Sequence, residues 1–198
     1  MCGIVGITSS KEVTSRIIGS LKKLEYRGYD SAGIATISEN NINEVKCEGR
    51  VNELEKNVNQ IKLSGTIGIG HVRWATHGKP STINAHPHSS DNVSVVHNGI
   101  IENSTILKKI LEKKGYKFKS QTDTEVIVHL VTDYLKKNNL KDTIIKVLKK
   151  LHGSFALGII FKDQPDLIIG ARRGSPLAVG YGPDEHYLGS DSYALKSM

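Results

Sequence analysis

Short runs of β-strand character dominate this sequence, and glycines separate nearly all of them. They cover residues 3–8, 32–38, 43–48, 66–73, 93–97, 154–162, 166–171, 177–181 and 186–189. Two pairs of runs follow one another closely, 32–38 with 43–48 and 154–162 with 166–171, which favours hairpins and antiparallel sheets over repeated βαβ units. Glu39-Asn40-Asn41 supplies a turn for the first hairpin.

Apolar residues at helical spacing mark further stretches at 11–25, 104–114, 123–137 and 141–152. In the second stretch the apolar stripe consists of Ile106, Leu107, Ile110 and Leu111. Gly115 is a suitable C-cap for that helix, and Thr122-x-x-Glu125 resembles a capping box that opens the third. Strands and helices together predict an α/β or α+β chain. No G-x-G-x-x-G sequence joins a strand to a helix, so a Rossmann cofactor site is not expected.

Size and composition limit the class of protein. With 198 residues, of which 38% are hydrophobic, the chain fits one domain with a sizeable core. Cys2 and Cys47 are too few cysteines for a disulfide scaffold. The longest apolar runs are too short to cross a bilayer, and the N-terminus lacks a signal-peptide pattern. We therefore expect a cytoplasmic protein that does not associate with membranes.

The formal net charge of +7 raises nucleic-acid binding as an alternative. Much of the excess lies in residues 108–119 and 136–150, each with six lysines against one acidic residue. Both segments include an amphipathic helix, so the lysines are expected on a solvated face rather than on a phosphate-binding surface. Aromatic residues interleaved with basic ones, as in RNA-binding surfaces, are absent. We expect no nucleic-acid partner.

Cys2 is the first candidate for chemistry. Removal of the initiator methionine leaves an α-amine and a thiol on the same residue. Ordinary pKa values are about 8.5 for the thiol and about 7.7–8.0 for the amine, so the amine can accept the thiol proton near neutral pH. One residue then supplies both nucleophile and base. The alternative is that Cys2 is an inert, small apolar residue.

Two short segments have the character of binding elements. Arg73, in the segment 71–78 at the end of an alternating strand, offers a planar guanidinium suited to a carboxylate. The alternative there is a structural salt bridge beside a core Trp74. Asn98-Gly99 ends a buried strand, where a side-chain amide and a backbone N–H can form an oxyanion hole. The alternative is an ordinary turn, which Asn-Gly also favours.

Asp123 and the histidines leave further possibilities open. Asp123 is either a helix-cap residue or the partner of a ligand's ammonium group. Five of the eight histidines fall in one stretch, namely His71, His77, His86, His88 and His97. His86-x-His88 could ligate a metal, but Pro87 interrupts regular presentation and no carboxylate or cysteine stands at metal-motif spacing. We expect no metal and no cofactor.

Six segments in combination resemble one known family. They are 1–6, 24–33, 73–78, 84–88, 97–103 and 122–125. Over essentially its whole length the chain is similar to the glutaminase domains of glucosamine-6-phosphate synthases, also called glutamine–fructose-6-phosphate aminotransferases (isomerizing). These are class II glutamine amidotransferases. The resemblance implies the N-terminal-nucleophile hydrolase fold, an α+β sandwich with four layers (α/β/β/α) and two mainly antiparallel sheets.

The resemblance also implies a role for each candidate residue. Cys2 attacks the side-chain amide of L-glutamine, and Asn98 and Gly99 stabilise the oxyanion. Arg73 binds the α-carboxylate and Asp123 the α-ammonium group. The remaining candidates are Trp74, which gates an ammonia channel, Thr76, His77 and Gly78, which line the glutamine pocket, and Arg27, which orders the terminus near Cys2.

Members of the family continue into two sugar isomerase lobes that this sequence lacks. We therefore expect residues 1–198 to be a glutaminase domain slightly truncated at its C-terminal end. In the full-length enzyme the ammonia is channelled to fructose 6-phosphate and yields glucosamine 6-phosphate, within the hexosamine and UDP-N-acetylglucosamine pathway. The resemblance implies a homo-oligomer for the full-length enzyme and a monomer for the isolated piece.

Overall fold

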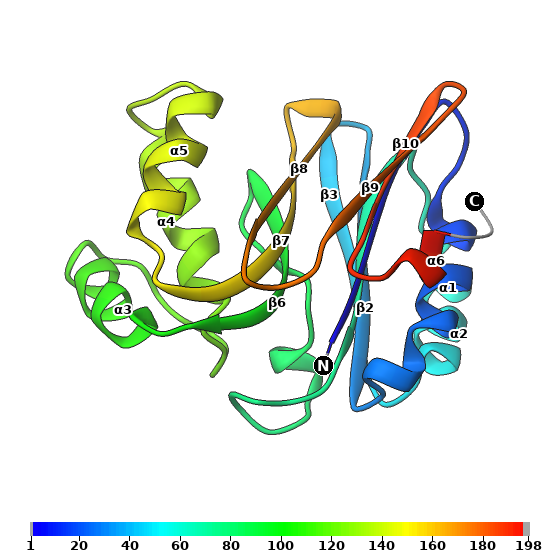
Figure 1. The fold of residues 1–198 in the computed structure, drawn as a ribbon, viewed down its shortest axis with the longest axis horizontal. Coiled ribbons are helices and arrows are strands. Elements are labelled where there is room, and N and C mark those ends of the chain that lie inside the picture. Colours follow the sequence, from blue (N-terminus) through cyan, green and yellow to red (C-terminus); the bar gives the residue numbers. More distant parts are fainter. Residues whose placement is uncertain (1, 196–198) are drawn as a thin grey trace.

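The computed structural model describes residues 2–195, in which two β-sheets pack face to face between two layers of helices (Figure 1). The larger sheet has the order β3-β2-β4-β1-β10-β9 and the smaller one β5-β6-β7-β8, with antiparallel neighbours throughout. The strands are β1 (Gly3–Ser9), β2 (Ser31–Ser38), β3 (Asn41–Glu48), β4 (Ile67–Arg73), β5 (His88–Ser89), β6 (Val93–Ile101), β7 (Gly153–Phe161), β8 (Gln164–Arg173), β9 (Ala178–Gly182) and β10 (Glu185–Gly189). The predicted four-layer sandwich is confirmed.

The helices divide between the outer faces of the two sheets (Figure 1). The larger sheet is covered by α1 (Thr14–Lys23), α2 (Val51–Ile61) and α6 (Ser192–Leu195). The smaller sheet is covered by α3 (Ser104–Lys113), α4 (Glu125–Leu135) and α5 (Leu140–Lys150). No helix in residues 2–195 is long and apolar enough to cross a membrane.

Strand alternation builds the apolar layers. In β7, Phe155, Leu157 and Ile159 pack against the helices on the smaller sheet. The intervening Ala156 and Ile160 point to the larger sheet instead. A strand buried on both faces needs an almost unbroken apolar run, and the β7 sequence has one. The layer between the sheets leads directly to the candidate site.

Helix α2 differs from the sequence prediction, which has no helix between residues 48 and 66. The helix buries only Val51, Leu54 and Val58, and its other positions are largely polar. So narrow a stripe, with two β-branched residues in it, carries little helical signal. Packing on the larger sheet supplies the stabilisation that the segment lacks by itself.

The predicted hairpins and the end of α3 are confirmed. Glu39 and Asn40 join β2 to β3 with positive φ values of 50° and 57°, as in a two-residue type I′ turn. Gly115 ends α3 in a Schellman motif, with its N–H on the Glu112 carbonyl (2.9 Å) and the next N–H on that of Leu111 (3.1 Å).

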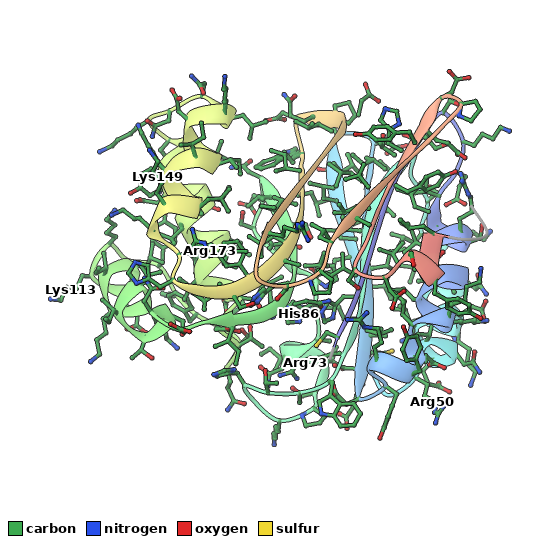
Figure 2. All side chains as sticks on the ribbon, viewed as in Figure 1. Arg50, Arg73, His86, Lys113, Lys149 and Arg173 are labelled. Atoms are coloured by element: carbon green, nitrogen blue, oxygen red, sulfur yellow. The ribbon has the colours of Figure 1, made fainter. Side chains whose placement is uncertain are left out.

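The α3 stripe is only half buried. Leu107 and Leu111 face the core, whereas Ile106 and Ile110 are 64% and 47% exposed. Lysines occupy the outer surface as expected, and Lys113 and Lys149 point away from the sheets in Figure 2.

The predicted capping box at Thr122 and Glu125 is wrong. Helix α4 begins at Glu125, whose carboxylate accepts hydrogen bonds from the backbone N–H groups of Lys119 (2.8 Å) and Ser120 (2.6 Å). The Thr122 hydroxyl instead lies 2.9 Å from Nε2 of His88. Glu125 therefore holds the loop before α4, which carries Asp123, rather than closing a cap with Thr122.

Candidate active site

The candidate residues gather where the apolar layer between the sheets ends. On β4, Ile67 and Ile69 belong to that layer, and Arg73 continues the same face of the strand because side chains alternate along it. By the same alternation Cys2, directly before β1, and Asn98, on β6, share a face with Ile4 and Val96 of that layer. The sheets thus converge on a group of polar side chains.

The Cys2 thiol lies against the backbone of Trp74. The Trp74 N–H donates to Sγ at 3.3 Å, and Sγ lies 3.5 Å from the Trp74 carbonyl oxygen. The pairing of Gly3 with Val72 between β1 and β4 creates this contact. Burial raises the pKa of the Cys2 thiol, whereas the Trp74 backbone and the Arg73 guanidinium lower it. Cys2 is thus half-buried among polar groups, unlike an inert core residue.

The Cys2 carbonyl oxygen accepts two hydrogen bonds. They come from Nδ2 of Asn98 at 2.9 Å and from Nε of Arg27 at 3.2 Å. The Arg27 guanidinium also pairs with Asp191 at 3.0 Å and donates to the Ser190 carbonyl at 3.4 Å. The main chain at Cys2 is therefore held by Asn98 of the smaller sheet and by Arg27 of the short 3-10 helix Glu25–Arg27.

Asn98 and Gly99 lie inside β6, opposite Ala156 and Phe155 of β7. The turn alternative is therefore wrong. Gly99 has a φ of 130°, and a Cβ atom there would stand 2.1 Å from the Ser154 carbonyl oxygen. Only glycine fits both the backbone conformation and the space.

Arg73 is buried beneath the loop that follows it. Only 2% of the residue is exposed. Its guanidinium donates hydrogen bonds to the carbonyl oxygens of Gly78 (3.0 Å), Lys79 (3.4 Å) and His77. None of the ion pairs found within residues 2–195 involves Arg73. The alternative of a structural salt bridge is thus not borne out.

Trp74 is not a core residue, because 49% of its surface is exposed. Its ring meets Tyr29 edge-on with the ring centroids 5.5 Å apart. Thr76 and His77 are also exposed, and the neighbouring Ala75 N–H donates to the Asp30 carboxylate. Together these residues form the loop 74–79, which covers the Arg73 guanidinium.

Asp123 is not a helix cap. Its Oδ2 accepts a hydrogen bond from the Ile101 N–H at 2.7 Å, and its Oδ1 lies 3.9 Å from Nδ1 of His97. The carboxylate is buried, with 8% of the residue exposed. It stands at the end of β6 that also carries Gly99.

A small cavity connects most of these groups. Its lining combines the predicted residues Cys2, Arg73, Trp74, Thr76, His77, Gly99 and Asp123 with His86, His97, Thr122 and Thr124. Asn98, Gly78 and Arg27 are not part of this lining. Its free volume of about 20 Å³ holds roughly one water molecule. A hollow of about 470 Å³ beside Glu12 and Lys162 contains neither cysteine nor histidine.

Four buried histidines lie at or next to the cavity, and the sequence interpretation considered only two of them, His86 and His88, as possible metal ligands. His71 stacks on His86 with ring centroids 4.3 Å apart, and His88 meets His86 edge-on at 4.8 Å. Figure 2 shows His86 and Arg73 close to one another between the sheets. Burial lowers the pKa of His71 and of His88 to about 3 and lowers that of His86 and His97 as well. Burial thus favours the neutral form of all four rings.

Three of these histidines, His86, His88 and His97, lie within hydrogen-bond distance of threonine hydroxyl groups. Thr124 Oγ1 lies 2.7 Å from Nε2 of His86 and 2.9 Å from Nδ1 of His97. No cluster of three or more potential metal ligands occurs among residues 2–195. One sequence signal could have revealed the burial of His71. The two-residue period of 66–73 places it on the same strand face as the buried isoleucines.

Known proteins resemble this chain over nearly all of its length. The family described as "Glutamine amidotransferase domain" matches residues 72–197. A "Glutamine--fructose-6-phosphate aminotransferase" (isomerizing) of Bradyrhizobium diazoefficiens is 54% identical over 196 residues, which is 98% of this chain and 32% of that protein. The protein of the same name from Clostridium acetobutylicum is 53% identical with the same coverage. The chain thus spans about a third of the length of these relatives.

Solved structures share the fold. Glutamine phosphoribosylpyrophosphate amidotransferase from B. subtilis, complexed with ADP and GMP, superposes with a TM-score of 0.86 at 31% identity. The match covers 98% of this chain and 43% of that chain. A glutamine aminotransferase class-II domain protein from Silicibacter pomeroyi has a TM-score of 0.65 at 12% identity, over 95% of this chain and 88% of that chain, which is a likeness of fold alone.

Proposed function

Because this chain belongs to the glutamine amidotransferase domain family, we propose that it hydrolyses the side-chain amide of L-glutamine to glutamate and ammonia through a thioester on Cys2. One observation carries the proposal. A single cavity is lined by Cys2, Arg73 and Asp123, which carry a thiol, a guanidinium and a carboxylate. Glutamine needs all three, because it presents an amide to a nucleophile, a carboxylate to a cation and an ammonium group to an anion.

In the proposed complex the glutamine carboxylate binds the Arg73 guanidinium in place of the carbonyl oxygens of the loop 74–79. A planar guanidinium suits a carboxylate better than it suits separate carbonyls, since two parallel charge-assisted hydrogen bonds form. Asp123 takes the α-ammonium group through Oδ1, because Oδ2 already accepts from the Ile101 N–H. Thr76, His77 and Gly78 form the wall of the pocket, and Trp74 closes it on the side where ammonia leaves.

The chemistry begins after removal of Met1, when the Cys2 α-amine becomes free to accept the thiol proton. The thiolate attacks the amide carbon, and the negative charge that develops on the amide oxygen is stabilised by Nδ2 of Asn98 and the N–H of Gly99. Each such donor contributes about 2.7–4 kcal/mol to the transition state. The ammonium group then returns the proton to the leaving nitrogen, so ammonia departs and a glutamyl thioester remains. Water cleaves the thioester to glutamate and regenerates the thiol.

We further propose that residues 1–198 act as the glutaminase domain of a longer cytoplasmic enzyme that passes ammonia to fructose 6-phosphate and makes glucosamine 6-phosphate. The aminotransferases named for fructose 6-phosphate are 53–54% identical to the chain, whereas the phosphoribosylpyrophosphate enzyme is 31% identical. The C-terminal truncation and the homo-oligomeric state of the full-length enzyme belong to the same proposal. This chain alone is expected to release ammonia without forming an amino sugar when fructose 6-phosphate is added.

The test uses the 198-residue protein with a diazoketone analogue of glutamine. Intact mass is measured before and after incubation, and glutamate release from L-glutamine is assayed in parallel. We expect loss of Met1, one adduct that maps to Cys2, and glutamate formation. Cys2→Ala removes both adduct and activity.

Cys47→Ala is the matched control, because Cys47 is the other free cysteine and lies buried in the core beneath α1 and α2. That variant retains the adduct and the activity. An adduct on Cys47, or a processed protein without adduct and without glutamate release, would contradict the proposed function.

A further inference from the structure

His71 is buried beside Asn98 and is not one of the residues that line the cavity. It lies on β4 opposite Ile4 of β1, with none of its surface exposed. Its Nε2 lies 3.0 Å from the His97 carbonyl oxygen and 3.1 Å from Oδ1 of Asn98. The imidazole is therefore within hydrogen-bond distance of both the main chain and the side chain of the segment that carries the proposed oxyanion hole.

The partners of Asn98 determine which way its carboxamide points. One end of that group lies 2.9 Å from the Cys2 carbonyl oxygen. A carbonyl oxygen only accepts hydrogen bonds, so the end that faces Cys2 is the NH₂ group and the end that faces His71 is Oδ1. Both atoms near Nε2 of His71 are then acceptors.

The hydrogen-bond partners likewise determine the tautomer of His71. Because its Nε2 faces two acceptors, this nitrogen carries the proton. Its Nδ1 is buried without a hydrogen-bond partner among the described residues, as befits the unprotonated nitrogen of a neutral ring. Stacking on His86 holds the plane of the imidazole. His71 is thus a neutral donor with its N–H directed at Oδ1 of Asn98.

We propose that His71 is the positioning residue of the oxyanion hole: its Nε2–H holds Oδ1 of Asn98 and so keeps Nδ2 directed at the reacting centre. Without this donor the carboxamide can rotate by half a turn. Oδ1 would then face the Cys2 carbonyl and the developing oxyanion, and repulsion would replace a hydrogen bond. This inference rests on the proposed glutaminase function and concerns the same site.

Replacing His71 by glutamine or by asparagine gives a matched pair of variants. The amide nitrogen of glutamine reaches the place of the imidazole Nε2, whereas that of asparagine reaches only the place of Nδ1. His71→Gln therefore restores the donor to Asn98, and His71→Asn does not. Both substitutions introduce the same functional group into the same buried position, so a general disturbance of the core affects them alike.

The experiment measures glutamine hydrolysis by the Met1-processed chain and these variants, with thermal unfolding as a check of folding. We expect His71→Asn to lower kcat about 10- to 100-fold with KM changed less than about threefold, because an oxyanion hole acts on the transition state. His71→Gln is expected within about threefold of the wild type. His88→Phe, a change to a buried histidine of the same cluster that has no bond to Asn98, is also expected within about threefold.

A double variant with Asn98 distinguishes a positioning role of His71 from a merely structural one. In an Asn98→Ala background, His71→Asn is expected to cause no further loss of kcat, because the group that it positions is gone. Equal kcat for His71→Asn and His71→Gln, or additive losses in the double variant, would overturn the positioning role while leaving the glutaminase function intact. A wild-type chain without glutamate release would overturn the proposed function itself, and this inference with it.

Discussion

The carboxylate of Asp191 lies 3.0 Å from Nη1 of Arg27, in a pair whose side chains are 25% and 8% exposed. The same guanidinium donates through Nε to the Cys2 carbonyl oxygen at 3.2 Å. Asp191 follows β10 and Cys2 precedes β1. Arg27, which contacts both residues, therefore joins the two ends of the described chain beside the proposed nucleophile. Asp191 thus fixes the main chain of Cys2 through Arg27.

Replacing Asp191 tests this connection. Asp191→Asn keeps the shape and removes the charge, and we expect it to lower the free energy of unfolding by about 1 kcal/mol because the pair is partly exposed. Glutamate release should fall several-fold, since the Cys2 main chain is less well held. Urea unfolding and glutaminase kinetics measure the two effects. Glu185→Gln breaks a comparable ion pair with Arg16 away from Cys2, and its kcat should stay at the wild-type value; equal kcat losses in both variants would contradict the prediction.

Gly99→Ala should be far more harmful than Gly115→Ala. Both glycines have positive φ, 130° and 91°, but an added Cβ meets the Ser154 carbonyl oxygen at 2.1 Å in the first case and open space in the second. We expect a loss of about 1 kcal/mol for Gly115→Ala. Gly99→Ala adds the clash, so it should lose several times as much and also abolish glutamate release. Similar unfolding midpoints for the two variants would show that β6 and β7 adjust without cost.

The Thr124 hydroxyl is expected to stabilise the histidine cluster. It is fully buried and bonds to both His86 and His97. Thr124→Val keeps the shape but leaves ring nitrogens unpaired, which should destabilise the protein by about 2–3 kcal/mol. Thr124→Ser keeps the hydroxyl and should lose about 1 kcal/mol for the missing methyl group. Chemical denaturation ranks the two variants, and a valine variant more stable than the serine variant would be evidence against these bonds.

Stability should fall on mild acidification. The pKa values of His71 and His88 are about 3 in the folded chain and about 6.5 in the unfolded chain. Below pH 6.5 the unfolded state binds more protons, so stability that is present above pH 6.5 is lost as the pH falls toward 3. Each histidine contributes a loss of about 1–2 kcal/mol by pH 5.

Urea unfolding between pH 7 and pH 5 measures this slope. Carboxyl groups contribute little to the slope in that range. Burial raises the pKa of Glu125, but hydrogen bonds from His129, Lys119 and Ser120 lower it to about 2, so this carboxyl group titrates at lower pH. His88→Asn should reduce the slope by about one proton. A pH-independent midpoint, or an unchanged slope in the variant, would mean that these rings are protonated in the folded state.

Local patterns predicted the hairpins and the helices α1, α3, α4 and α5 well, because their signals lie within a few residues. Helix α2 escaped because its three buried residues form a stripe only when the larger sheet lies beneath them. Asn98-Gly99 has the local signature of a turn, yet the pairing of β6 with β7 keeps both residues in a strand. Thr122 and Glu125 have the spacing of a capping box, but the loop at 119–120 competes for the Glu125 carboxylate.

For the site, the sequence named most of the residues that line the cavity, because Cys2, Arg73 and Asp123 belong to motifs that resemble a known family. Their roles toward glutamine stay predictions. The contacts that hold these residues in place could not be predicted from the sequence. Asn98 bonds to Cys2 and Arg27 to Asp191 across large separations in sequence, and only the sheet topology brings such residues together. The histidine cluster was missed for the same reason.

Strand β1 is hydrogen-bonded on both sides, with Val5 opposite Gly70 of β4 and Gly189 of β10. During synthesis, β1 leaves the ribosome before any other strand described here, and β10 leaves after all of them. Pairing between segments so far apart in sequence is slow and awaits the later partner. A nascent chain without β10 lacks the strand that pairs with β1 and the Asp191 carboxylate that pairs with Arg27, so we expect the proposed site to form only after β10 has been translated.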